Sequence, residues 1–157
     1  MPRLRVPQFW LDALIAGGCA ALLSGIPSTV YAWLTGRDIM EATRAAGAML
    51  ISARSSDTAL FWSAAIVHSV VTIFWAMLLT WALPRKRTFA WALVASAGIA
   101  LLDLRVIGRW FPEIHALDFW PQFADHLMWG GVLGAVLQWR WCPRSESNRH
   151  AFKGGGF

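Results

Sequence analysis

Two histidines and two aspartates interrupt stretches of this sequence that are otherwise apolar: His68, Asp103, Asp125 and His126. A histidine beside a carboxylate holds its proton more easily, and such a pair suits proton relay or proton sensing. Two histidines and two aspartates could also bind a divalent metal. However, the HxxxH and HxxE spacings that place two ligands on one helix face do not occur, so we expect no metal site.

The expected partners define a candidate polar cluster. We expect Asp103 to pair with Arg105 or Arg109, and Asp125 to pair with one of the two histidines. An ionisable residue inside a membrane costs about 2.5–3.5 kcal/mol at the helix centre, so a group of them indicates a functional site. The members of the candidate polar cluster are His68, Asp103, Arg105, Asp125 and His126.

A purely structural role is open for each member of this cluster. Asp103 and Arg105 would then form an ion pair that pins the helix ends. Asp125 would cap its own helix after Pro121 or pair with Arg109. His68 would be a hydrogen-bonded core residue without a further role.

The helices that must hold these residues follow from the length of the apolar runs. A membrane-spanning helix needs about 20 residues. The third and fourth runs have only 15 and 14 uncharged residues, Thr88 to Leu102 and His126 to Trp139. Each must therefore include a carboxylate, Asp103 or Asp125, to cross a bilayer. The sequence predicts an all-α, four-helix transmembrane bundle with spans at about 10–34, 60–83, 88–108 and 119–140.

Two further segments complete the predicted organisation. Residues 36–57 are helix-prone and too charged to span, so we expect an additional amphipathic helix at the interface after the first span. Residues 1–142 form one membrane domain. Residues 143–157 are polar and then glycine-rich, and we expect a disordered tail. Both a native and a non-native origin of this tail are open.

Small residues mark the helix faces expected to pack, because lipid provides no hydrophobic drive between helices. On the fourth predicted span, Gly130 and Gly134 follow His126 at intervals of four. The stripe on the third span ends at Asp103 and contains Ala92, Ser96 and Ala100. On this pattern, exposure of His68, Asp103 or His126 to lipid is not expected.

The composition is typical of a membrane protein. Of the 157 residues, 57% are hydrophobic and 15% are charged, whereas soluble domains carry about 25% charged residues. The net charge of +5 comes from short basic clusters between apolar runs, which indicates topology signals and lipid contacts rather than nucleic-acid binding. No nucleophile elbow or cofactor fingerprint occurs, so we expect no cofactor, and the chain leans away from an enzyme.

The basic residues also predict an orientation. With the N-terminus inside, nine lysines and arginines lie in inner segments and five in outer ones, which favours two cytoplasmic termini. Nine of the eleven tryptophans fall near predicted helix ends, and only Trp75 and Trp129 lie deeper. That distribution is typical of aromatic belts at both membrane surfaces.

Two segments resemble parts of small, uncharacterised bacterial integral membrane proteins with four predicted spans. These are DIMEATRAAGAML (38–50) and LDLRVIGRWFPEIHALDFWPQFADHLMWGGVLGAVL (102–137). The resemblance implies a multi-pass protein of the bacterial inner membrane and transfers no site residues. We expect a non-enzymatic accessory, scaffold or sensor subunit, with a protein partner or a homo-oligomer. The alternative is a small oligomeric transporter or a proton or ion pathway.

Overall fold

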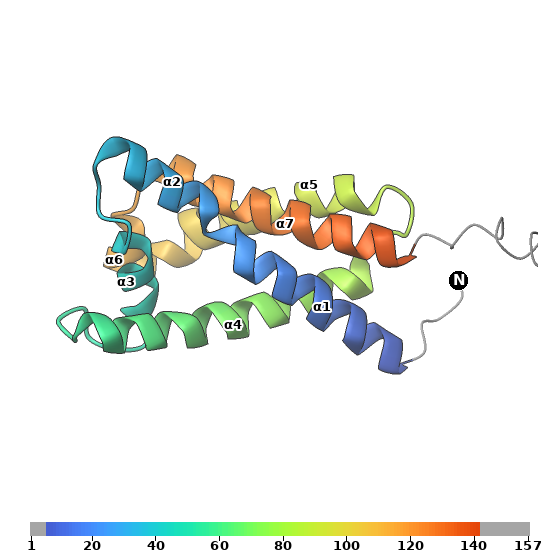
Figure 1. Ribbon diagram of the computed structural model, residues 1–157, viewed down its shortest axis with the longest axis horizontal. Helices are drawn as coiled ribbons and strands as arrows, with labels where there is room; N and C mark the ends of the chain where they lie inside the picture. The colour runs from blue at the N-terminus through green and yellow to red at the C-terminus, as the bar shows by residue number, and fades with distance from the viewer. Residues whose placement is uncertain (1–5, 142–157) are drawn as a thin grey trace, which may run out of the picture.

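A computed structural model describes residues 6–141, and within this range the chain is helical and forms no strand (Figure 1). The predicted tail at 143–157 lies outside the described residues. The elements in chain order are α1 (Val6–Ser24), α2 (Ile26–Thr35), α3 (Glu41–Gly47), α4 (Asp57–Ala82), α5 (Thr88–Leu101), the π-helix η1 (Leu102–Val106), the 3₁₀-helix η2 (Ile107–Trp110), α6 (Pro112–His115) and α7 (Phe119–Trp141).

Three stretches of helix are long and apolar enough to cross a membrane: Gln8–Thr35, Asp57–Ala82 and Thr88–Trp110. They correspond to the first three predicted spans, so the composition of these helices indicates a membrane protein. The fourth predicted span, which corresponds to α7 (Phe119–Trp141), is not among them. Although α7 has 23 residues, it is less apolar than the other three because it contains charged and amide side chains.

The first predicted span is two helices rather than one. α1 ends at Ser24, α2 begins at Ile26, and Gly25 lies between them. Pro27 explains the break, because proline lacks an N–H and its ring collides with the carbonyl four residues earlier. α1 packs on α4 and α7, whereas α2 continues along α7 towards the opposite end of the molecule (Figure 1).

The predicted amphipathic helix over 36–57 is much shorter in the structure. Only α3 is helical in this region, and turns follow it. α3 packs closely on α4, where the Ser63 hydroxyl donates to the carbonyl of Gly47 at 2.7 Å. A Cβ atom on Gly47 would lie 2.2 Å from the Leu60 carbonyl oxygen, so this contact requires glycine. Its location at a membrane interface stays a prediction.

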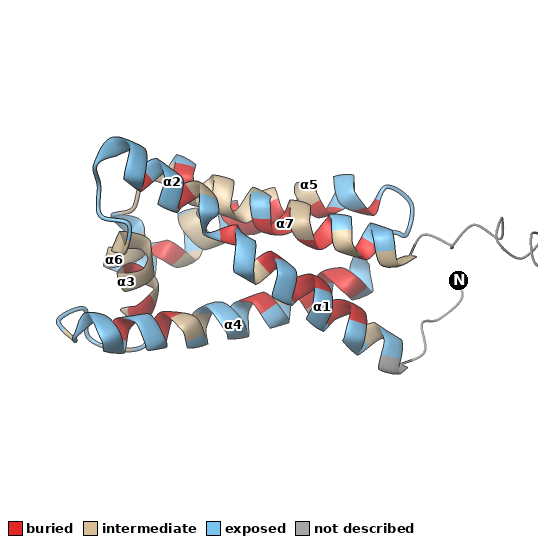
Figure 2. Ribbon diagram, in the orientation of Figure 1, coloured by how far each residue is buried: buried red, intermediate tan, exposed pale blue. Residues whose placement is uncertain are grey.

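The most extensive helix contact joins α5 and α7 through the small residues that the sequence marked. Ala92, Ser96 and Ala100 are fully buried, and Gly130 and Gly134 lie against the first two. Figure 2 shows the buried residues concentrated along the facing sides of the helices. α7 therefore approaches α5 with almost no side chain between their backbones.

We predict that Gly130→Ala lowers the free energy of unfolding by about 1–3 kcal/mol, because the new methyl group overpacks the interface. Its Cβ would lie 2.3 Å from the Cβ of Ser96. Gly131→Ala is the matched control, since its nearest neighbour would be 3.5 Å away. There the better helix propensity of alanine should raise stability by up to about 1 kcal/mol. Unfolding in SDS–detergent mixtures measures both changes, and equal effects would contradict the packing assignment.

The exposed tryptophans lie near the ends of the long helices. Trp129, in the middle of α7, is only 7% exposed, whereas Trp33, Trp81 and Trp120 are each more than 70% exposed. The other large exposed tryptophans near helix ends are Trp10, Trp62, Trp91, Trp110 and Trp139. Exposed indole rings at helix ends and a buried one in the middle fit two membrane–water interfaces.

Candidate functional site

Two titratable side chains contact the break between α1 and α2, one at the end of α1 and one at the start of α2. At the C-terminal end of α1, the Ala21 carbonyl lies 3.2 Å from His68 Nε2 of α4. A backbone carbonyl only accepts hydrogen bonds, so His68 Nε2 carries the proton and donates. A histidine at a helix C-terminus also complements the negative end of the helix dipole.

At the N-terminal end of α2, the carboxylate of Asp125 takes the complementary position. Asp125 Oδ1 accepts from the backbone N–H of Ser28 at 2.9 Å. This N–H is one of the groups that a helix N-terminus leaves without an intrahelical partner. A carboxylate is stabilised there because the helix dipole places positive charge at its N-terminus. α7 thus supplies the cap for a helix that Pro27 has interrupted.

The next residue of α7, His126, contacts η1 instead of α2. Its Nε2 lies 3.3 Å from Asp103 Oδ2, and its Nδ1 lies 2.8 Å from the Gln122 carbonyl oxygen. The carbonyl accepts only, so Nδ1 must donate. An ionised Asp103 also accepts only, so the Nε2 contact needs a second proton, on the ring or on the carboxyl group. The pair therefore holds one shared proton when this contact is made.

A local change in helix geometry brings Asp103 to this position. Residues 102–106 form the π-helix η1, which widens the turn at the end of α5. Single π-turns inserted in α-helices are frequent at functional sites. Gly108 in η2 permits the tight path that follows, since a Cβ there would lie 3.1 Å from the Asp103 carbonyl oxygen.

The predicted partners of the two aspartates differ from those observed. Arg105 does not pair with Asp103 but lies over the Phe119 ring, 4.3 Å from its centroid, in a cation–π contact. Among residues 6–141, the ion pair of Asp103 is with His126. Asp125 binds a backbone N–H rather than the side chain of His68 or His126.

The structure brings four of the five candidate residues to the helix break and its flank. His68 and Asp125 contact its two ends, while His126 and Asp103 lie beside Asp125 on α7 and η1. Arg105 points to an aromatic ring instead. The expectation that His68 is shielded is wrong, because its side chain is exposed. The side chains of Asp103 and His126 are 24% and 25% exposed.

A second polar site, at the other end of the molecule, was missed by the sequence reasoning. Asp12 in α1 has a side chain that is 1% exposed, and its Oδ1 accepts from Arg140 Nε at 2.6 Å. Its Oδ2 accepts from the indole N–H of Trp141 at 2.9 Å. Arg85 in turn lies over the Trp141 ring at 5.7 Å. The available signal was Asp12 itself, a carboxylate three residues inside the first predicted span.

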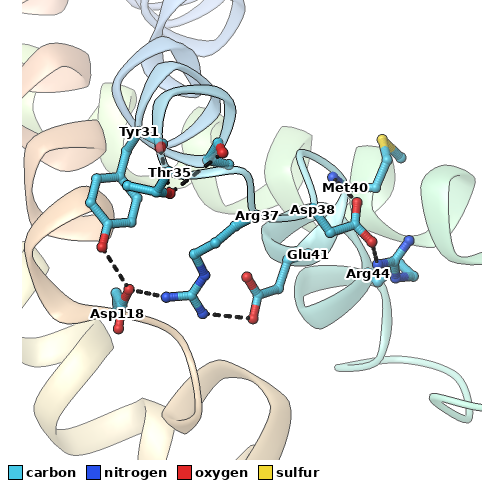
Figure 3. Close-up of polar contacts among 9 residues, drawn as sticks. Tyr31, Thr35, Arg37, Asp38, Met40, Glu41, Arg44 and Asp118 are labelled. Carbon is cyan, nitrogen blue, oxygen red and sulfur yellow. Dashed lines mark hydrogen bonds and ion pairs between the residues drawn. The ribbon is translucent and has the colours of Figure 1, made fainter.

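A network of surface charges joins the connections at the end where α3 and α6 lie. Asp118 accepts from the Tyr31 hydroxyl at 3.0 Å and also pairs with Arg37, which reaches Glu41 at 3.2 Å. Figure 3 shows the Arg37 side chain lying between these two carboxylates. This network fixes the chain after α2 to the start of α7 through contacts that solvent and salt weaken.

The neighbouring ion pair of Asp38 and Arg44 should make the stability of α3 depend on pH. The hydrogen bond from Arg44 lowers the pKa of Asp38, and the backbone N–H of Met40 adds to this effect. A lowered pKa in the folded state means stabilisation that is full above the usual carboxyl pKa of about 3.9 and is lost below it. We expect the amide-exchange protection of α3 to be constant between pH 5 and 7 and to fall in acid. In Asp38→Asn, that acid-dependent step should disappear.

Two cavities within the described residues are lined by other side chains than those of this cluster. One small cavity of about 30 Å³ lies beneath the surface network, beside Tyr31, Arg37 and Asp118. A wider apolar groove of about 440 Å³ runs along α5 and α7. His68, Asp103 and Asp125 line neither of them. Within residues 6–141, no three His, Cys, Asp or Glu side chains are grouped closely enough to bind a metal ion.

Comparison of the chain with protein-family models, with curated proteins and with solved structures gives no match. The resemblance of residues 38–50 and 102–137 to four-span bacterial membrane proteins therefore stays a prediction. Functional assignment has to start from the contacts described above.

Proposed function

We propose that this protein is a non-enzymatic membrane sensor subunit that responds to protons through the pair formed by His126 and Asp103. The observation that carries the proposal is the position of the two ring nitrogens of His126. Nδ1 faces the carbonyl oxygen of Gln122, and Nε2 faces a carboxylate oxygen of Asp103. One bound proton makes the second contact a hydrogen bond, and histidine chemistry allows that proton to exchange near physiological pH.

Loss of the proton converts this contact from attraction to repulsion. The Nδ1 proton is held by the Gln122 carbonyl at 2.8 Å, so the ring loses the proton at Nε2. The lone pair of Nε2 then faces an ionised carboxylate at 3.3 Å without a hydrogen between them. Two acceptors at that distance repel, which favours separation of η1 from α7.

The neighbouring residue links this event to the helix break. Asp125 and His126 are consecutive in α7, and Asp125 caps α2 through the N–H of Ser28 at 2.9 Å. A shift of α7 at His126 therefore also moves the cap of α2. Hinge motions are absorbed at a few loop or element-terminal residues, so the break between α1 and α2 is suited to such a shift.

We further propose that α7 is the fourth span of a four-helix transmembrane bundle. Intramembrane polar residues almost always face the protein interior and pair there. Asp125 binds the Ser28 N–H, His126 binds Asp103, and Arg140 binds Asp12. Each ionisable side chain of α7 thus has a partner on another helix. This pattern explains how a helix of lower hydropathy could cross a bilayer.

The orientation belongs to the same proposal. The excess of basic residues in the segments on the side of the termini favours both ends in the cytoplasm of a bacterial cell, with the helix break in the outer half of the inner membrane. A reporter fused after Trp141 should be active only as a cytoplasmic fusion. Activity of a periplasmic reporter at that position would reverse the orientation.

The sensor proposal is tested by following the helix break during a pH titration. In lipid bilayers, the backbone amide signals of Gly25 and Ser28 should shift in one step between pH 5 and 9, together with the ring signals of His126. His126→Gln should abolish that step, whereas His115→Gln, a change in the exposed connection, should leave it intact. Amide signals that do not change with pH, or that shift as much in His126→Gln as in the wild-type protein, would exclude the sensor role.

A small transporter or proton pathway is the second candidate, and the broken first span favours it. Transporters place ion and substrate sites at discontinuous helices, where helix ends point towards charged groups. The accessory sensor is preferred because both ring nitrogens of His126 make direct contacts that one proton can switch. Proton flux into liposomes that depends on Asp125, and that is lost in Asp125→Asn, would favour the transporter instead.

A further inference from the structure

An apolar groove of about 440 Å³ lies along α5 and α7, and no member of the polar cluster lines it. Phe89 and Ala135 line one end, Pro27 and Ala124 line the other, and Leu93 and Met128 lie between them. The groove is open along its length, and its lining is apolar. In a membrane-spanning protein, such a groove faces the hydrocarbon of the lipid tails.

The length of the groove matches one lipid tail. Ala124 and Ala135 both lie on α7, and the helix rise places them about 16 Å apart along its axis. The hydrocarbon core of a bilayer is about 30 Å thick, so the tails of one leaflet extend about 15 Å. An acyl chain that starts near Phe89 would therefore end close to Pro27.

A basic turn lies at the Phe89 end of this groove. Arg85, Lys86 and Arg87 are exposed and connect α4 to α5, and Phe89 follows two residues later. Arg85 is stacked over the Trp141 ring. Within residues 6–141, Lys86 and Arg87 take part in no ion pair. Basic side chains at a membrane surface attract anionic headgroups, each by about a factor of five.

We propose that the groove and the basic turn together bind one anionic glycerophospholipid. The phosphate lies against Lys86 and Arg87, and one acyl chain lies in the groove from Phe89 to Pro27. The charge of the turn selects the headgroup, and the apolar groove holds the chain. Neither member of the proton-binding pair, Asp103 or His126, lines this groove.

Native mass spectrometry of the purified full-length protein tests the headgroup. The probes are long-chain phosphatidylglycerol and phosphatidylcholine, added in equal amounts. The wild-type protein should retain one phosphatidylglycerol in preference to phosphatidylcholine. Lys86→Gln with Arg87→Gln should weaken phosphatidylglycerol binding about thirtyfold, for two charges at about 1 kcal/mol each. Arg54→Gln with Arg109→Gln removes the same charge at the opposite end and should leave binding unchanged.

Filling the groove with a larger side chain tests whether an acyl chain lies in it. Ala135→Phe should weaken the binding of long-chain phosphatidylglycerol and leave dihexanoyl phosphatidylglycerol unaffected. Val94→Phe is the control, since Val94 is 63% exposed on α5 outside the groove. Equal affinity for the two headgroups, or an Ala135→Phe variant that behaves like Val94→Phe, would overturn the proposal. Lipid-free dimers that dissociate only in Ala135→Phe would overturn it too, by assigning the groove to a second copy of the chain.

Discussion

Arg140→Gln should lower the free energy of unfolding by about 3–5 kcal/mol, the largest loss we expect from any single change in this protein. The carboxylate of Asp12 is 1% exposed and depends on Arg140 for its neutralising charge. Removing the cation leaves a buried charge whose remaining hydrogen bond within residues 6–141 comes from the indole N–H of Trp141. Unfolding in SDS–detergent mixtures, followed by the loss of helical circular dichroism, measures the change.

The double variant Asp12→Asn with Arg140→Gln separates the buried charge from other causes. If the stranded carboxylate is responsible, removing its charge should recover most of the lost stability. Arg37→Gln is the control for an exposed ion pair and should have a much smaller effect. An Arg140→Gln variant as stable as Arg37→Gln would mean that the contact with Asp12 does not hold α1 against α7.

Asp125→Ala should have the second largest effect, a loss of about 1.5–3 kcal/mol in the free energy of unfolding. The backbone N–H of Ser28 would lose its acceptor, and α2 would lose the negative charge at its N-terminus. Asp125→Asn keeps an oxygen that can accept, so it should lose roughly half as much. The same unfolding measurement applies, together with amide exchange at Ser28.

Asp118→Ala is the matched control for this position. Asp118 precedes α7 on the same side of the molecule, but its side chain is 45% exposed and binds Arg37 and the Tyr31 hydroxyl. Its loss should affect stability less than Asp125→Ala and should leave exchange at Ser28 unchanged. Faster exchange at Ser28 in Asp118→Ala, with none in Asp125→Ala, would contradict the capping role of Asp125.

The sequence predicted the parts of the fold that depend on local chemistry. Pro27 accounts for the break in the first span by local chemistry alone, because the missing N–H is a property of the residue itself. The small residues at Ala92, Ser96, Gly130 and Gly134 indicated the α5–α7 contact, because only small side chains let two backbones approach so closely. The bounds of α4 and α7 followed from the apolar runs.

The exposure of His68 could not be predicted in this way. Ala64 and Thr72 lie one turn before and one turn after it, and both are buried. However, the start of α4 packs on α3 around Gly47, and its second half packs on α1 around Gly17. His68 lies between these two contacts, where the Ala21 carbonyl of α1 reaches it but its side chain stays exposed. A stripe of small residues predicts which face of a helix packs. It does not show where along that face one partner helix ends and the next begins.

The pairings that define both polar sites depend on tertiary structure. Asp12 and Arg140 are 128 residues apart, and nothing in their local sequence connects them. The π-helix at 102–106 decides which way Asp103 points, and its sequence gave no sign of an extra residue in the turn. This is why Arg105, close in sequence, was expected as the partner of Asp103 and His126 was not.

Nitrogen NMR of the histidine rings tests the claim that His126 and Asp103 share one exchangeable proton. The protein is labelled with ¹⁵N-histidine and studied in lipid bilayers from pH 5 to 9. We predict that both ring nitrogens of His126 carry protons at the acidic end, and that Nε2 alone loses its proton as the pH rises. In Asp103→Asn, this Nε2 step should move to a different pH, while His115 is unchanged. A His126 ring that titrates identically with and without the Asp103 carboxylate would contradict the claim.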